Sequence, residues 1–250
     1  MSSDPNVRDT FIDIMGIHIL EPMAVLTDLI VSAVCLYCFF KLKNTMKGQA
    51  PFIRLYAIFF LVMSITTFLG GWFGHAFLDR ISIAWKLPGW LSSMIAIGFA
   101  ERAAIMHANP YFRPRLGRFI SWFNIFEIAF FVIITLITLE FKYVEMHVIY
   151  GLLLIVFSFE TLVYIKSRDR GSRLVQYGIG VAVIMGLVHV LKLSPHKWFN
   201  YLDLAHVFMA IALYVIYLGV KKMMIVPDFV IINEEIFDRP EVAASPELKS

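Results

Sequence analysis

The sequence has few charged residues and few cysteines, and each shortage excludes a class of protein. Asp, Glu, Lys and Arg make up 16% of the 250 residues, hydrophobic residues make up 59%, and the mean hydropathy is +0.74. Ordinary soluble domains carry about 25% charged residues, so the composition indicates a protein of the lipid bilayer. The two cysteines, Cys35 and Cys38, are too few for a disulfide scaffold or a cysteine-rich zinc domain. We interpret them as small lipid-facing or helix-facing residues.

Long polar stretches are also lacking. Hydrophobic segments lie at 22–40, 55–78, 82–100, 119–139, 144–165, 174–192 and 200–220. Each is close to the roughly 20 residues that a helix needs to cross a bilayer. We therefore predict an all-α polytopic membrane protein with seven transmembrane helices in residues 1–222. Residues 223–250 form an acidic tail, which we expect to be a solvated or partner-binding segment in the cytoplasm.

The distribution of basic residues predicts the orientation of the chain. If the N-terminus lies outside, sixteen of the 22 Lys and Arg residues lie inside, in the segments 41–54, 102–118, 166–173 and 221–249. This positive-inside bias predicts an N-out, C-in topology. No basic region precedes the first apolar run, so we expect a reverse anchor and no cleaved signal peptide. We expect the protein in the inner cell membrane or an endomembrane, with membrane lipids and no nucleic acid as partners.

Three histidines stand near the predicted outer ends of three hydrophobic segments. His75, His189 and His206 belong to the second, sixth and seventh segments, and Asp203 precedes His206 by one helical turn. A carboxylate in a membrane helix costs roughly 2.5–3.5 kcal/mol and therefore needs a cationic partner, a metal ion or a polar pocket. Imidazole and carboxylate are both zinc ligands, so the pattern predicts a shared metal ion. The other four histidines we expect to be exposed: His18, His107, His147 and His196.

A structural interpretation of the same residues stays open. Gly70, Gly71 and Gly74 lie beside His75 and would allow close helix packing without any ligand. His75 could then bind a neighbouring carbonyl group, and Asp203 could bind His206 only to fasten the last helix.

Two carboxylates form a second predicted group in the inner half. Glu127 lies about eight residues from the inner end of the fourth segment, and Glu160 about seven from that of the fifth. At similar depth on adjacent helices they would not both ionise. We predict that they share a proton or a common partner, the alternatives being separate pairing with Asn124, Tyr164 or a loop arginine.

The histidines of the second and seventh segments resemble those of the CREST superfamily, which includes alkaline ceramidases and the progestin and adiponectin receptors. His75, in "GGWFGHAF", matches the helix-two zinc ligand of that family, and His206, in "NYLDLAHVFM", matches one histidine of its helix-seven pair. The same segments also look like uncharacterised bacterial membrane families. The resemblance covers the topology and about ten residues of motif.

The chain departs from the family's pattern at other positions. Gly71 stands where the family has serine, and Leu202 stands four residues before His206, where the family has the partner histidine. Asp203 or His189 would therefore have to be the third zinc ligand.

The resemblance implies hydrolysis of a lipid amide or ester. Three-coordinate zinc lowers the pKa of bound water toward about 7 and polarises the carbonyl group. Asp79 or Asp203 would act as general base, and Asp28 would be an accessory polar group.

Two other classes of function remain open. A sensor or transport protein would use Asp28, Glu127, Glu160 and the histidines as a proton relay. A haem-binding redox protein would use intramembrane histidines as axial ligands.

Overall fold

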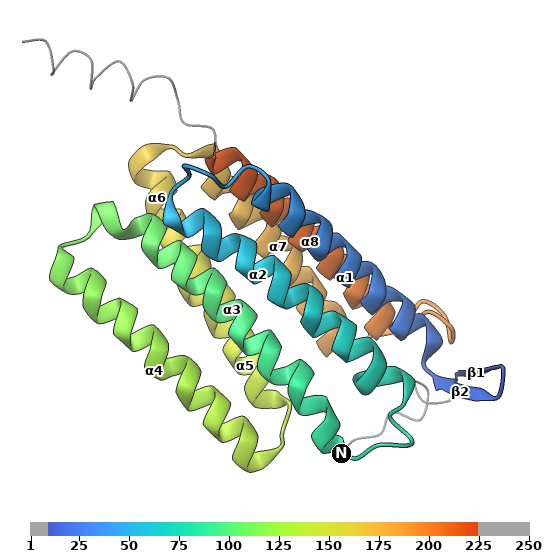
Figure 1. Cartoon of the computed structure of the whole chain (residues 1–250). Coiled ribbons are helices and arrows are strands. Elements are labelled where there is room, and N and C mark those ends of the chain that lie inside the picture. Colours follow the sequence, from blue (N-terminus) through green and yellow to red (C-terminus); the bar gives the residue numbers. More distant parts are fainter. Residues whose placement is uncertain (1–9, 225–250) are drawn as a thin grey trace, which may run out of the picture.

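A computed structural model describes residues 10–224 as a bundle of long helices with a short N-terminal hairpin (Figure 1). The long elements, in chain order, are α1 (Pro22–Lys43), α2 (Pro51–Leu69) with its π-helical continuation η1 (Gly70–Ala76), α3 (Leu87–Ala108), α4 (Pro114–Thr138), the continuous helix of α5 (Lys142–Ile149), π-helical η4 (Tyr150–Val156) and α6 (Phe157–Ser167), then α7 (Arg170–Val190) and α8 (Tyr201–Met223). The short elements are β1 (Phe11–Ile14), β2 (Ile17–Leu20), η2 (Ile83–Lys86) and η3 (Asn109–Tyr111).

Local sequence signals explain where the helices begin. A proline occupies the first or second position of α1, α2, α3 and α4, where its missing N–H group is not needed. Asp169 accepts hydrogen bonds from the backbone at the start of α7. Asn200 and Asp203 form a capping box at the start of α8.

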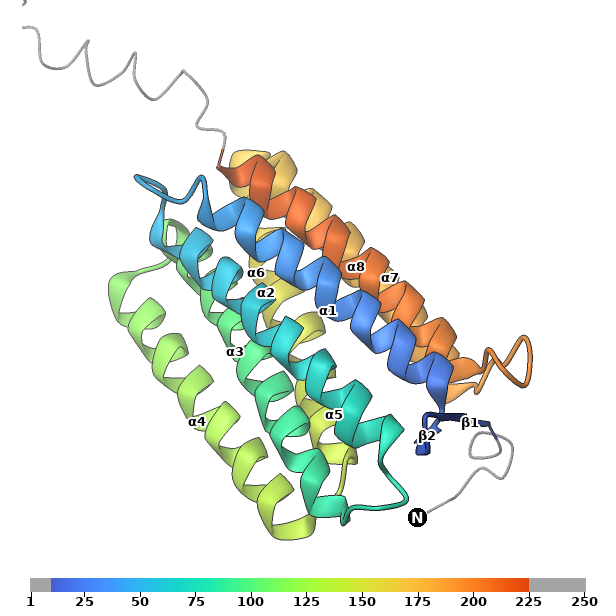
Figure 2. The ribbon, with the colours of Figure 1, turned by 45° about the vertical axis from the view of Figure 1, so that its right-hand side comes forward.

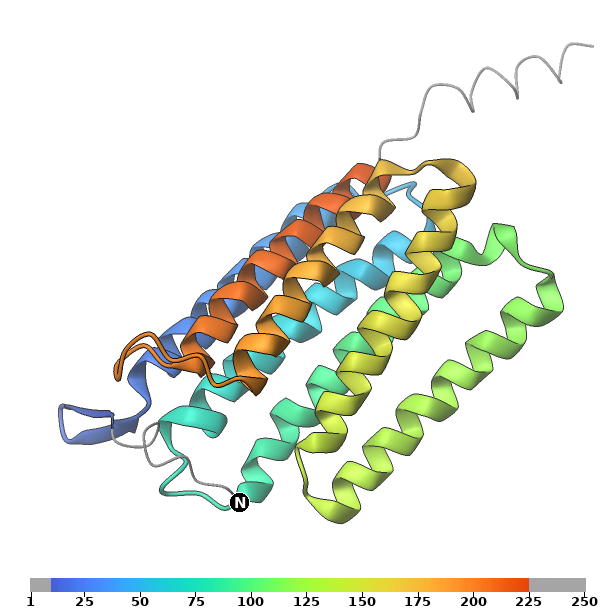
Figure 3. The same cartoon turned by 180° about the vertical axis from the view of Figure 1, so that it is seen from behind.

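The helices run side by side along the bundle, with α4 at one edge (Figures 1 and 3). On the other side of the bundle α1 lies beside α8, and α8 beside α7 (Figure 2). Glycines allow the tight contact between α7 and α8, because a Cβ atom on Gly178 would lie 2.9 Å from the carbonyl oxygen of Ala212. Gly171 and Gly219 face each other in the same contact.

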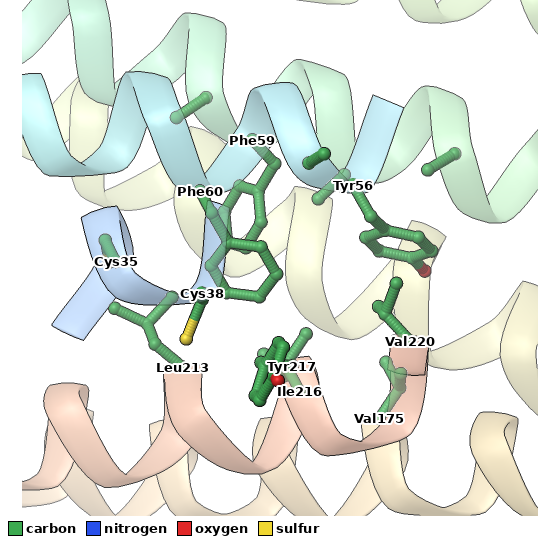
Figure 4. Close-up of a cluster of buried hydrophobic side chains, with 14 of the residues drawn as sticks. Cys35, Cys38, Tyr56, Phe59, Phe60, Val175, Leu213, Ile216, Tyr217 and Val220 are labelled. Carbon is green, nitrogen blue, oxygen red and sulfur yellow. The ribbon is translucent and has the colours of Figure 1, made fainter. Parts of the chain in front are cut away.

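A cluster of buried apolar side chains joins α1, α2, α7 and α8 (Figure 4). Phe60 and Tyr217 pack edge to face, with their ring centroids 6.4 Å apart. Cys35 and Cys38 are buried and unbonded in this core, which agrees with their interpretation as small packing residues.

The chain is an all-α polytopic membrane protein. Within residues 10–224, six helices are long and apolar enough to cross a membrane: Pro22–Lys43, Pro51–Ala76, Pro114–Thr138, Lys142–Ser167, Arg170–Val190 and Tyr201–Met223. α3 completes the set of seven and packs against α2, α4 and α6. It is less apolar because it contains Glu101 and Arg102; Arg102 Nη1 donates a hydrogen bond of 2.6 Å to the carbonyl oxygen of Ser121 in α4.

The loops at the two ends of the bundle differ in their content of Lys and Arg, in agreement with the count from the sequence. The hairpin and the α7–α8 loop lie at one end, and the α1–α2, α3–α4 and α6–α7 loops, rich in Lys and Arg, lie at the other (Figure 1). Assignment of the basic end to the cytoplasm remains a prediction. The acidic tail, apart from its first two residues, lies outside the described residues.

An N-terminal hairpin, which was not predicted from the sequence, precedes α1. β1 and β2 are antiparallel, with Phe11 opposite Leu20. Met15 and Gly16 form the turn with φ angles of 52° and 79°, the positive values that a two-residue hairpin requires. The hairpin leads directly into α1 and so places Glu21 at the end of the bundle.

Candidate metal centre

Three side chains from three helices converge at the hairpin end of the bundle. Asp28 comes from α1, His75 from η1 and His206 from α8, and one ligand atom of each lies within 4.8 Å of the others. The two imidazoles approach the same carboxylate: His75 Nε2 lies 3.7 Å from Asp28 Oδ2, and His206 Nε2 lies 3.5 Å from Asp28 Oδ1. We call these three residues the outer cluster.

The second nitrogen of each imidazole has its own partner. His75 Nδ1 lies 2.5 Å from Glu21 Oε2 and donates to it, since an ionised carboxylate only accepts. His206 Nδ1 lies 2.9 Å from Thr27 Oγ1. The single hydroxyl proton of Thr27 is directed at the carbonyl oxygens of Met23 and Ala24, so Thr27 accepts from His206.

These bonds determine which face each imidazole presents to Asp28. With a proton on Nδ1, a neutral histidine carries its lone pair on Nε2. Two Nε2 lone pairs and one carboxylate then lie close together, and a cation held between them, either a proton or a metal ion, relieves their repulsion. An Nδ1–H group bound to a carboxylate or other acceptor is the usual arrangement of a metal-ligating histidine.

The backbone around the outer cluster is shaped to admit Asp28. A Cβ atom on Gly70 would lie 3.3 Å from Asp28 Oδ2, and one on Gly71 would lie 3.3 Å from Asp28 Cβ. The π-helical turn of η1, a distortion common at functional sites, carries His75 at the end of this glycine-rich stretch. Glu21 adopts the left-handed conformation, with φ 44° and ψ 53°, which an L residue keeps only where its surroundings hold it.

The donor set and spacing fit a zinc ion. Donors that bind tetrahedral zinc at about 2.0–2.2 Å lie about 3.4 Å apart. The distances from His75 Nε2 to Asp28 Oδ2, 3.7 Å, and from His206 Nε2 to Asp28 Oδ1, 3.5 Å, are close to this value, and one ligand atom of each residue lies within 4.8 Å of the others. Two imidazoles and one carboxylate are also a common catalytic zinc set, which leaves the fourth coordination position open.

The two residues predicted as alternative third ligands serve other purposes in the structure. His189 Nε2 lies 3.4 Å from Glu145 Oε1, so its ring faces α5 and is absent from the outer cluster. Asp203 Oδ2 accepts the backbone N–H of Asn200 at 2.6 Å. Asp28, predicted only as an accessory group, takes the third position, because α1 lies between η1 and α8 at this end.

The two predicted general bases have different environments. Asp79 is exposed in the turn after η1. Asp203 is fully buried, and its Oδ1 atom has no hydrogen-bond partner among the described residues. Asp203 is also close enough to Asp28 and His75 for their charges to interact.

The predicted pairing of Glu127 with Glu160 is wrong. Glu160 Oε1 accepts a hydrogen bond of 2.7 Å from the Tyr56 hydroxyl, and His107 Nδ1 lies 3.2 Å from Glu160 Oε2. Glu127 instead groups with Glu101 and His147. The depth count failed because α4 begins at Pro114 and not near 119, which moves Glu127 about 8 Å further from the inner end at 1.5 Å per residue.

The expectation that His107 and His147 are exposed is also wrong. His147 is fully buried, and the side chain of His107 is 14% exposed beside Glu160. Glu101 was not among the predicted site residues, because the third hydrophobic segment ends at residue 100, whereas α3 continues to Ala108. The alanines that follow Glu101 favour helix, and they indicate that the third helix continues past residue 100 and includes Glu101.

Fold and site together define a class: a seven-helix membrane protein with a histidine–carboxylate cluster between the ends of its helices. The comparison with protein families gives a more specific assignment. The chain belongs to the family described as "Family of unknown function (DUF6962)", whose model matches residues 23–225. No curated protein and no solved structure matches the chain.

Proposed function

We propose that the protein is a zinc-dependent intramembrane hydrolase that acts on a lipid amide or ester. The observation that carries this proposal is the convergence of two imidazole Nε2 atoms on Asp28 while both Nδ1 atoms are held by Glu21 and Thr27. An arrangement made only for packing needs neither the orientation of both rings nor the glycines beside Asp28.

Each residue of the outer cluster has a role in this proposal. Asp28, His75 and His206 hold the ion, and Glu21 and Thr27 orient the two rings. Bound zinc supplies a Lewis acid and lowers the pKa of water toward about 7. Asp203 accepts a proton from the attacking water at its unpartnered Oδ1 and returns it to the leaving group. The carbonyl carbon gains the water oxygen, the bond to nitrogen or oxygen breaks, and a fatty acid and an amine or alcohol leave.

A lipid is the substrate class that suits this location. The outer cluster lies where α1, η1 and α8 reach the end of the bundle, so a head group at the interface can reach it while acyl chains stay in the bilayer. The side chains of His75 and His206 are 17% and 12% exposed, which leaves a partial opening. The resemblance of His75 and His206 to the CREST zinc ligands also supports a lipid amide.

Metal analysis of the full chain in detergent tests the proposal. We expect His75→Ala and His206→Ala to abolish zinc binding at the outer cluster and, together with it, hydrolysis of fluorescent ceramide and of a fluorescent lysophospholipid ester. His189→Ala is the matched control, because His189 stands at the same end of the bundle and binds Glu145. Unchanged zinc content in the His75 and His206 variants contradicts the proposal. A Soret band in the purified protein would indicate haem instead.

A proton-coupled transporter or sensor is the second candidate. The buried residues Tyr56 and Glu160 form a hydrogen-bonded group with the partly buried His107 toward the basic end of the bundle, and such groups often mark proton pathways in membrane proteins. Proton flux into liposomes that is lost in Glu160→Gln, with no hydrolysis by the wild-type chain, would favour this candidate.

A further inference from the structure

A second group of ionisable side chains lies between α3, α4 and α5, near the middle of the first two of these helices. Glu101 comes from α3, Glu127 from α4 and His147 from α5, and one ligand atom of each lies within 4.8 Å of the others. His147 Nε2 lies 3.8 Å from Glu127 Oε1. Glu101 and His147 are completely buried, and Glu127 is 8% exposed. We call these residues the middle cluster.

Most polar atoms of the middle cluster have no hydrogen-bond partner. Among the described residues, nothing bonds Glu101 Oε1, either carboxylate oxygen of Glu127, or either ring nitrogen of His147. Buried polar groups are normally paired, and an exception in a native structure needs an explanation such as a missing ion. One ligand atom of each residue lies within 4.8 Å of the other two, and each residue has an unpaired atom, which points to a ligand that these three residues share.

The surroundings hold members of the middle cluster in place. Asn124 of α4 donates to Glu101 Oε2, which holds that carboxylate while its Oε1 stays available. A Cβ atom on Gly151 would lie 2.5 Å from Ile97 Cγ2 and closer still to Glu101 Oε1. The π-helical segment η4 begins at Tyr150, three residues after His147, and Phe131 packs edge to face against the His147 ring.

We propose that the middle cluster binds one divalent first-row transition metal ion. Two carboxylates supply two negative charges, which a divalent ion neutralises, and neutral imidazole completes the donor set. Carboxylate oxygens suit manganese, and imidazole suits zinc and iron, so this mixed set selects ions of that class over Ca²⁺ or Mg²⁺. The site is separate from the outer cluster, and the proposal does not rest on the hydrolase activity.

Manganese binding to the full chain in detergent tests the proposal. The His75→Ala/His206→Ala variant removes the outer cluster. After stripping with a chelator and titration with Mn²⁺, we expect this variant to bind one ion per chain, counted by electron paramagnetic resonance. Pulsed measurements should show coupling to one imidazole nitrogen, whereas an ion in the outer cluster would couple to two.

Variants of the middle cluster complete the experiment. In the same background, Glu127→Gln and His147→Gln should weaken Mn²⁺ binding by more than about 100-fold, since even loss of an outer partner of a metal ligand costs about 10–100-fold. Glu145→Gln is the matched control, because Glu145 lies in α5 two residues from His147 and is 41% exposed. It should leave binding unchanged.

Three results would overturn the proposal: no bound Mn²⁺ in a folded outer-cluster variant, no nitrogen coupling, or undiminished binding in Glu127→Gln. The first would mean that the middle cluster holds protons only. The nitrogen coupling is read without any substitution in the middle cluster, so the test does not depend on the folding of those variants. If zinc-dependent lipid hydrolysis is absent but Mn²⁺ binding is retained, the proposal for the outer cluster fails and the proposal for the middle cluster stands.

Discussion

The outer and middle clusters use the same types of side chain but differ in how these are supported. In the outer cluster both histidines have a hydrogen-bond acceptor at Nδ1, provided by Glu21 and Thr27. In the middle cluster His147 has no hydrogen-bond partner among the described residues at either nitrogen. The protein therefore orients the side chains of the outer cluster before any ion binds, whereas the orientation of the side chains in the middle cluster depends on the ion that they bind.

This difference has a consequence for metal removal. Chelation should leave the outer cluster in place, because its hydrogen bonds remain and a proton can replace the ion between the imidazoles and Asp28. The middle cluster should lose stability, because unpaired carboxylates and imidazole remain buried in the bundle. We therefore expect rapid exchange of the metal ion at the outer cluster and a strong dependence of folding on the metal ion at the middle cluster.

Removal of the shared carboxylate should have the largest effect. In Asp28→Ala we expect zinc affinity at the outer cluster to fall by more than about 100-fold, beyond the about 10–100-fold that follows loss of an outer partner, because both imidazoles converge on that side chain. Competition with a fluorescent zinc chelator measures the affinity. Asp13→Ala, which removes a carboxylate paired with His18 in the exposed hairpin, should have no effect; equal affinity in both variants would refute the assignment of Asp28.

Loss of the carboxylate that orients His75 should have a smaller effect on the same affinity. Glu21→Gln should lower zinc affinity by about 10–100-fold, the usual result when the partner of a ligating histidine is changed. The same chelator competition measures it. Glu145→Gln, at the exposed His189 pair, should behave as wild type, and an equal loss there would show that the effect is not local to the outer cluster.

Filling the space beside Glu101 should destabilise the middle cluster. Gly151→Ala should lower the free energy of unfolding by about 1–3 kcal/mol, typical of overpacking, and should weaken Mn²⁺ binding, because the new methyl group meets Glu101 and Ile97. Thermal unfolding in detergent measures the change. Gly180→Ala is the control, since a Cβ atom there meets nothing within 4 Å; similar destabilisation of both variants would contradict the prediction.

The smallest effect is expected at the hydroxyl that orients His206. Thr27→Val keeps the shape but removes the acceptor, and zinc affinity should fall by about threefold to tenfold, because a neutral hydrogen bond contributes about 0.5–1.5 kcal/mol. Titration calorimetry resolves a change of this size. Thr67→Val is matched, since the Thr67 hydroxyl bonds only the carbonyl oxygens of Met63 and Ser64 in its own helix. A greater loss at Thr67 would contradict the assigned role of Thr27.

The outer cluster could be predicted in part because its histidines lie near helix ends. Hydrophobic runs mark such ends within a few residues, so His75 and His206 could be placed at one level of the membrane. The third position was not predictable. To predict it, one must know which helices lie beside α1. Whether Asp28 faces η1 and α8 or the lipid depends on the rotation of α1 in the bundle.

The middle cluster could not be predicted because it depends on the lateral packing of helices. Depth alone paired Glu127 with Glu160, whereas α4 packs on α3 and brings Glu127 to Glu101. Hydropathy ended the third segment before Glu101, although its alanines continue the helix to Ala108. Composition, hydropathy and charge determined the membrane class and the approximate spans, because these depend on transfer of each segment from water to lipid. Only the tertiary structure decided which polar side chains meet, because a polar group in a bundle is positioned by the rotation and neighbours of its helix, and these result from the packing of all the helices together.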